Sequence, residues 1–152
     1  MRIEAIRQAH AADLFRLYDA LDDQPPGNHP DASERLTVYF ERINCWPHSG
    51  IFGCFDQDQL LGSYSLIVVP LLVHGGRQIG IVESVVVDSL RRGQGIGRQL
   101  MEDAARRGRQ AGCYKLMLSS NLRRHQAHDF YAQLGFQRHG YSYHLEIDHA
   151  EP

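Results

Sequence analysis

The chain has 152 residues, of which 43% are hydrophobic and 22% are charged. This length suits one compact domain with a real core and is too short for two domains of ordinary size, so we expect a single domain over residues 1–152. The formal net charge of −2 at pH 7 gives no bulk attraction for nucleic acid. No apolar run approaches the ~20 residues of a membrane helix. We therefore expect neither a nucleic-acid partner nor a membrane partner.

The beginning of the chain and the cysteines indicate the compartment. Residues 1–15, MRIEAIRQAHAADLF, contain no apolar export segment and no small-residue cleavage site, so we expect a cytoplasmic protein. Cys45, Cys54 and Cys113 are odd in number and have no CxxC spacing, which argues against a disulfide framework and against a zinc site. We expect buried thiols and no metal.

The first part of the chain predicts one strand and two helices. Residues 2–7 alternate between apolar and polar, which is typical of a short strand. Residues 10–23 repeat leucines at helical spacing until the prolines of QPPGNHPD end the helix. A second amphipathic helix is predicted over residues 32–46.

A meander of three strands follows, at residues 50–56, 59–74 and 79–87, with turn sequences between them. After a glycine-rich stretch, apolar residues at intervals of four predict a helix; they are Ile96, Leu100, Ala104 and Gly108. On its other face we expect ion pairs from Glu102 to Arg106 and from Asp103 to Arg107. A strand over 112–120, a helix containing AHDFYAQL and a last strand over 140–147 complete the order.

This order predicts an α+β fold. The strand, helix and strand around the glycine-rich stretch should be parallel and right-handed, in a sheet that is otherwise antiparallel.

The glycine-rich stretch RRGQGIGRQL, residues 91–100, lies between a strand and a helix. Backbone N–H groups at a helix N-terminus have no acceptor within the helix and attract anions, and glycine lets a ligand approach closely. A dinucleotide fingerprint needs a third glycine where Arg98 stands, and the triphosphate loop needs a GK pair that the chain lacks. A tight turn without ligand is the remaining alternative.

Two motifs together resemble the GNAT superfamily of acetyl-CoA-dependent N-acetyltransferases. The first is [QR]xxGx[GA], matched by Arg92, Gly95 and Gly97, and the second is AHDFYAQLGF, residues 127–136. The resemblance implies a single GNAT-like domain with a mixed, mostly antiparallel sheet, splayed at the acetyl-CoA site and covered by helices on both faces.

By this resemblance, acetyl-CoA binds along the central strand and at the glycine-rich loop. The backbone of Val85 and Val87 would pair with the pantetheine arm like an added strand. The residues expected at the pyrophosphate are Arg92, Gly93, Gln94, Gly95, Ile96, Gly97 and Arg98. The family's usual proline after the strand is Ser89 here.

Two residues are the catalytic candidates. Tyr131 matches the tyrosine that protonates the departing thiolate in the family, with a core aromatic as the alternative. Alternation along the strand puts Glu83 on one face with Ile79, Ile81, Val85 and Val87. Burial there would raise its pKa and suit a general base; the alternatives are an ion pair with an arginine and a solvent-exposed position.

Asn121 is a further candidate for coenzyme contact, although many family members have their asparagine where this chain has Arg124. His125 and His128 are one helical turn apart, but without a carboxylate or cysteine at fixed spacing we expect no metal site.

The acceptor is predicted only as a primary amine, most simply a small molecule. NLRRHQAHDFY is similar to aminoalkylphosphonate N-acetyltransferases and GCYKLML to glucosamine-6-phosphate N-acetyltransferases. Arg123, Arg124 and His125 could serve an anionic substrate, the coenzyme or only solvent, and Asp19, Asp22 and Asp23 could attract a cationic amine. A protein or peptide acceptor and a non-catalytic acyl-CoA sensor are the alternatives. Exposed strand edges in this family also allow a homodimer.

Overall fold

The computed structural model describes residues 1–21, 27–43 and 45–147. The chain forms two compact units, Met1–Leu118 and Ser119–Pro152. Within the described residues, no helix is both long enough and apolar enough to span a bilayer.

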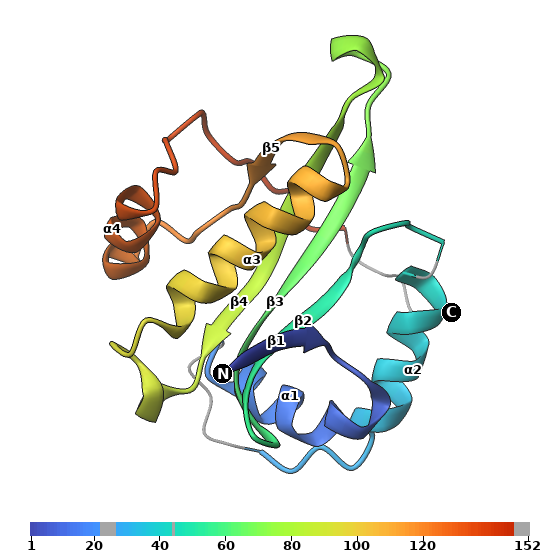
Figure 1. Ribbon diagram of the computed structural model, residues 1–152, viewed down its shortest axis with the longest axis vertical. Helices are drawn as coiled ribbons and strands as arrows, with labels where there is room; N and C mark the ends of the chain where they lie inside the picture. Colours follow the sequence, from blue (N-terminus) through green and yellow to red (C-terminus); the bar gives the residue numbers. More distant parts are fainter. Residues whose placement is uncertain (22–26, 44, 148–152) are drawn as a thin grey trace. The chain divides into compact units, whose positions relative to one another are not determined.

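The first unit is built on a five-stranded sheet with the order β1-β2-β3-β4-β5. Its strands are β1 (Arg2–Ala5), β2 (Gly50–Asp56), β3 (Gln59–Pro70), β4 (Gln78–Val87) and β5 (Cys113–Met117). Neighbours from β1 to β4 pair antiparallel, whereas β5 pairs parallel to β4 (Figure 1). A parallel pair needs a long crossover, and here a helix supplies it. The predicted meander, the parallel unit and the α+β class are confirmed.

Helices cover both faces of this sheet. They are α1 (Ala11–Asp19), which follows a 3-10 turn at Gln8–His10, α2 (Ala32–Ile43) and α3 (Ile96–Gln110). Tyr64 and Ser65 are neighbours in β3 and therefore point to opposite faces. The Tyr64 hydroxyl donates to Asp103 of α3, whereas Ser65 lines a cavity together with Tyr18 of α1.

Small residues allow α3 to pack closely on the sheet. A Cβ atom added to Gly108 of α3 would lie 2.9 Å from Leu116 Cδ2, and one added to Gly80 of β4 would lie 2.5 Å from the same atom. A side chain at either position would displace the Leu116 side chain of β5, which lies between the helix and the sheet. The predicted apolar face of α3 is confirmed, since Ile96, Leu100, Ala104 and Gly108 are all buried.

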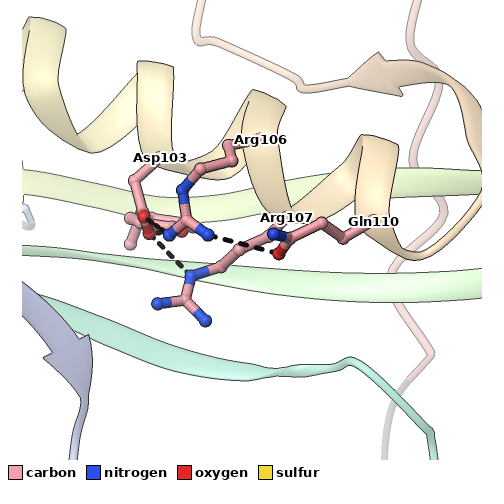
Figure 2. A network of polar contacts seen from close by, with 5 residues as sticks. Asp103, Arg106, Arg107 and Gln110 are labelled. Atoms are coloured by element: carbon pink, nitrogen blue, oxygen red, sulfur yellow. Dashed lines mark hydrogen bonds and ion pairs between the residues drawn. The ribbon is translucent and has the colours of Figure 1, made fainter.

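A polar network joins α3 to β3 (Figure 2). Asp103 accepts hydrogen bonds from the Tyr64 hydroxyl at 2.6 Å and from Arg107 Nε at 2.6 Å, and it also accepts one from Arg106. The Arg107 guanidinium lies 3.8 Å from the centroid of the Phe52 ring. The predicted Asp103–Arg107 pair is confirmed, but its exposed position is wrong, because only 8% of the surface of Asp103 is accessible. The predicted pair between Glu102 and Arg106 is wrong. Arg106 instead forms an ion pair with Asp103 and donates a hydrogen bond to Gln110.

The third predicted strand ends earlier than expected. β3 stops at Pro70, whose missing N–H group cannot continue a ladder of hydrogen bonds. Leu72 and Val73 beyond it are 98% and 61% exposed, and the chain turns at His74–Gly76.

The second unit contains α4 (His125–Gln133), as predicted. The predicted last strand is not found, because residues 140–147 have no secondary structure and are exposed. Tyr141, Tyr143, Leu145 and Ile147 are between 79% and 89% exposed. Alternation signals a strand with one apolar face, but a strand also needs a neighbouring backbone, and the described residues offer this segment none.

The cysteines differ in burial from the prediction. Cys54 is buried, but Cys113 is half-buried and Cys45 is exposed. Burial raises the pKa of the Cys54 and Cys113 thiols, so neither is activated as a thiolate.

The buried network predicts that Asp103→Asn lowers the free energy of unfolding by about 2 kcal/mol, because hydrogen bonds to a charged group are lost and two arginines lose their partner. Urea titration measures the loss. Asp58→Asn is the control, since the Asp58 side chain is fully exposed and its change should stay within about 0.5 kcal/mol. Equal stability of the two variants would contradict a stabilising network.

The same network makes this stability depend on pH. Burial alone would raise the pKa of the Asp103 carboxyl, but hydrogen bonds from Tyr64, Arg107 and Arg106 outweigh burial and lower the pKa below its ordinary value of 3.8. A lowered pKa contributes stability above the ordinary value and loses it as the pH falls through the folded-state pKa. The difference between wild type and Asp103→Asn should therefore shrink below about pH 4.

Candidate active site

The pairing between β4 and the edge strand β5 ends before the middle of β4. β5 pairs with β4 only from Gln78 to Ile81, at Cys113 to Met117 of β5, although β4 continues to Val87. Among the described residues, no strand pairs with Val82–Val87 on this side. An unpaired edge presents a row of backbone donors and acceptors to which an extended ligand can add. Val85 and Val87 therefore lie on a stretch of β4 that no described strand pairs with on this side, and a contact of these two residues with coenzyme stays a prediction.

A β-bulge interrupts β4 at the same place. Ser65 of β3 lies opposite Glu83, and Ser63 lies opposite Val86, so β4 holds one residue more than β3 between these pairs. Ser84 has a φ of 52°, a conformation that costs a non-glycine residue about 1–3 kcal/mol and that clusters at functional sites.

The bulge changes which side chains share a face. Directly opposed residues in an antiparallel pair lie on the same face, and Glu83 opposes Ser65 whereas Val87 opposes Gly62. Ser65 and Gly62 are three residues apart in β3 and point to opposite faces. The predicted common face of Glu83, Val85 and Val87 is therefore wrong, because regular alternation does not survive an extra residue. Ile79, Ile81 and Glu83 do share a face.

Glu83 is exposed to solvent. No ion pair joins it to an arginine in the described part of the chain. Of the three environments expected for this carboxylate, the structure shows the solvent-exposed one, on the face of the sheet covered by α1 and α2. Its role as a base stays a prediction.

Asp88 organises the turn from β4 to the glycine-rich loop. Its carboxylate accepts a hydrogen bond from the Leu90 N–H at 3.0 Å and pairs with Arg16 of α1 at 3.4 Å, and its own N–H donates to the Leu61 carbonyl at 2.8 Å. A 3-10 turn at Ser89–Arg91 follows. Asp88 was not among the predicted site residues, although an aspartate before a turn is a common capping signal.

The glycine-rich loop leads into the N-terminus of α3. Gly93 and Gly95 have φ values of 76° and 79°, and a Cβ on either would meet no atom within 4 Å, so conformation rather than space requires glycine there. Gly95 is the N-cap of α3, and Gln99 N–H donates to its carbonyl at 3.1 Å. The N–H groups of Ile96, Gly97 and Arg98 precede that bond and have no acceptor within the helix. With the exposed Arg92 and Arg98, this loop fits a pyrophosphate.

The remaining predicted residues belong to the second unit. Tyr131 of α4 is half-buried and its ring packs 5.2 Å from Phe130 and 5.8 Å from Phe136. Asn121 Oδ1 accepts a hydrogen bond from the Arg123 N–H at 2.9 Å, so its side chain already serves the local turn. Tyr131 and Glu83 lie in different units, and their meeting at one site stays a prediction.

The histidines and acidic residues have local partners. The His125 and His128 rings meet edge to face with their centroids 5.9 Å apart, and no group of three metal-ligating side chains gathers among the described residues. Asp19 accepts a hydrogen bond from the Gly27 N–H at 2.7 Å and pairs with His29 at 2.8 Å; the predicted Asp22 and Asp23 lie outside the described residues.

Comparison with known proteins identifies the class. Residues 14–136 match the model of the acetyltransferase (GNAT) family. The chain is 38% identical to the glucosamine 6-phosphate N-acetyltransferase of Trypanosoma brucei brucei over 97% of its own length and 96% of the relative's. It is 39% identical to the aminoalkylphosphonate N-acetyltransferase of Salmonella typhimurium over 43% of each protein.

Solved structures of acetyltransferases have a similar fold. An acetyltransferase from Trypanosoma brucei has a TM-score of 0.77 and 27% identity, covering 96% of this chain and 99% of that one. The glucosamine-6-phosphate N-acetyltransferase of Arabidopsis thaliana has the same fold, with a TM-score of 0.81, 20% identity and coverage of 97% and 98%. The chain belongs to the GNAT family and is an N-acetyltransferase, and enzymes of this family use acetyl-CoA.

The loop geometry predicts that Gly95→Val weakens coenzyme A binding at least about tenfold, because a β-branched residue resists positive φ and would reorient the loop donors. Calorimetric titration with coenzyme A measures the change. Gly75→Val is a matched control: Gly75 has a φ of 72° and equally open space, but lies in the turn between β3 and β4. Equal affinities of the two variants would contradict a role for the loop.

Proposed function

We propose that this enzyme transfers the acetyl group of acetyl-CoA directly to a small primary amine. The observation that carries the proposal is the unpaired edge of β4, which runs into the glycine-rich N-terminus of α3. The two features lie in the order in which a coenzyme's pantetheine arm and pyrophosphate follow each other. The family match covers residues 14–136 and so spans both units, which supports their acting as one domain.

The donor would be held mainly by backbone atoms. Val85 and Val87 would pair with the pantetheine arm as a neighbouring strand does. The loop donors from Gly93 to Arg98 would bind the pyrophosphate, assisted by the positive end of the α3 dipole. Asn121 is a weaker candidate for coenzyme contact, since its amide oxygen is engaged by Arg123.

Acetyl transfer requires that the acceptor ammonium loses a proton and that the departing thiolate gains one. Glu83 would remove a proton from the acceptor ammonium, directly or through water, so that the neutral nitrogen attacks the thioester carbonyl. A C–N bond forms, the C–S bond breaks, and Tyr131 would give its proton to the leaving thiolate. Transfer from a phenol of pKa ~10 to a thiolate of pKa ~8.5 is uphill by about 2 kcal/mol, which a local environment can offset.

The relatives support an acceptor that carries both an amine and an anionic phosphorus group, because glucosamine 6-phosphate and aminoalkylphosphonates share these two groups. Exposed basic side chains begin α4, where Arg123, Arg124 and His125 lie. Arginine binds phosphate and phosphonate oxygens in a bidentate manner, which favours this interpretation.

An amine panel tests the proposal. Thiol release from acetyl-CoA is followed with glucosamine 6-phosphate, 2-aminoethylphosphonate, a polyamine and a peptide amine. We expect turnover with at least one phosphorus-bearing amine.

Tyr131→Phe should lower that turnover by about 10²-fold while coenzyme affinity is unchanged, and Tyr141→Phe, at an exposed tyrosine, should have no effect. Coenzyme binding without turnover on any amine would favour a non-catalytic sensor.

Glu83→Gln should lower kcat/KM by about 10²-fold near neutral pH, since a general base contributes on this scale. The loss should shrink as the pH rises toward the pKa of the acceptor amine, because the amine then loses its proton without help. Glu102→Gln is the control, at an exposed glutamate of α3. A loss that stays constant with pH would point to a structural role for Glu83.

A further inference from the structure

A cavity of about 230 Å³ lies between α1 and α2 on one side and β2, β3 and β4 on the other. It lies wholly within the first unit. Its lining combines apolar and hydroxyl-bearing side chains; they are Leu14, Phe15, Tyr18, Leu36, Tyr39, Ile51, Ser65 and Ser84. Tyr18, Tyr39 and Ser84 are half-buried, whereas the other lining residues are buried.

Two buried hydroxyl groups in this region lack hydrogen-bond partners of normal geometry among the described residues. They are the hydroxyl groups of Tyr39 and of Ser63, which lies on this face of β3. Ser65 nevertheless lies near enough to Tyr39, and Ser63 near enough to Tyr18, to offset part of the rise that burial causes in the pKa of each phenol. A buried polar group without a partner destabilises a folded protein, so each such group calls for an explanation. One explanation is that a polar ligand binds here, because the ligand would supply the missing hydrogen-bond partner.

The phenols stay protonated. Burial raises the pKa of Tyr18 to about 12 and also raises the pKa of Tyr39, while the neighbouring Ser65 hydroxyl offsets part of each rise. Both tyrosines and both serines of the lining are therefore neutral hydroxyl groups, each able to donate and to accept.

The cavity adjoins the bulge of β4. Ser84, the residue with positive φ, lines it, and Ser65 lies directly opposite Glu83 in the sheet. A ligand in the cavity is thus next to the carboxylate proposed as the base. Val85, the other residue of the bulge, begins the stretch of β4 proposed to pair with the pantetheine arm.

We propose that this cavity binds the hydroxyl-bearing part of the acceptor amine, with Tyr39 and Ser65 as specificity-determining residues. The assignment rests on the proposed acetyltransferase function. An amino sugar matches the lining, because its C–H groups suit the leucine and phenylalanine walls and its hydroxyl groups suit the phenols and serines. The carbon chain of an aminoalkylphosphonate bears no hydroxyl and would leave the same groups unpaired.

Calorimetric titration with saturating coenzyme A tests the assignment without turnover. The probes are glucosamine 6-phosphate and 2-aminoethylphosphonate, and the variants are Tyr39→Phe and Ser65→Ala. Each variant should weaken glucosamine 6-phosphate binding about tenfold and leave any binding of 2-aminoethylphosphonate unchanged. Tyr114→Phe is the control, since Tyr114 of β5 packs against Arg77 and His74. Tyr39→Phe should change Tm little, because no described residue makes a hydrogen bond of normal geometry with its hydroxyl.

The outcomes separate this assignment from the proposed function. Wild-type affinity of Tyr39→Phe and Ser65→Ala for glucosamine 6-phosphate would overturn the cavity assignment, even if the enzyme acetylates the sugar. Failure of the wild type to bind glucosamine 6-phosphate would overturn it as well. Binding that the variants weaken, without thiol release, would support the cavity and contradict catalysis.

Discussion

The site depends on one constraint, the close contact of α3 with β4 and β5. Gly80 and Gly108 leave room for Leu116 between helix and sheet, which holds the beginning of β5 against the beginning of β4. The crossover helix begins at the other end of β4, beyond the glycine-rich loop. Because β5 is short, its pairing with β4 stops at Ile81, and among the described residues no strand pairs with the rest of β4 on the side away from β3. The same packing therefore holds β5 at the start of β4, while the edge beyond Ile81 leads toward the N-terminus of α3.

The bulge adds a second constraint at the centre of the site. An extra residue in β4 lets Glu83 and Val86 both face α1 and α2, and Val86 joins the core beneath these helices. The strand can thus bury an apolar side chain after the bulge and keep a carboxylate exposed before it. Positive φ at Ser84 is the energetic cost of this arrangement.

Buried polar groups on the two faces of the sheet differ in whether they have hydrogen-bond partners. On the α3 face, Asp103 has a partner for each of its oxygens and links the helix to β3. On the other face, Tyr39 and Ser63 have buried hydroxyl groups without partners in the described part of the chain. The first arrangement stabilises the fold, while the second is a cost that the free protein carries beside its candidate active site.

The sequence by itself determined the order of the elements as far as α4, the glycine-rich loop and the family, because helical spacing, alternation and glycine-dependent turns are local properties. It did not determine the face of Glu83 relative to Val87, since a bulge depends on how two distant segments pair. The burial of Asp103 and the cavity of Tyr39 and Ser65 likewise arise where helix and sheet meet. Alternation over residues 140–147 predicted a strand that the structure does not show, because a strand requires hydrogen bonds to a second backbone and not only a favourable pattern.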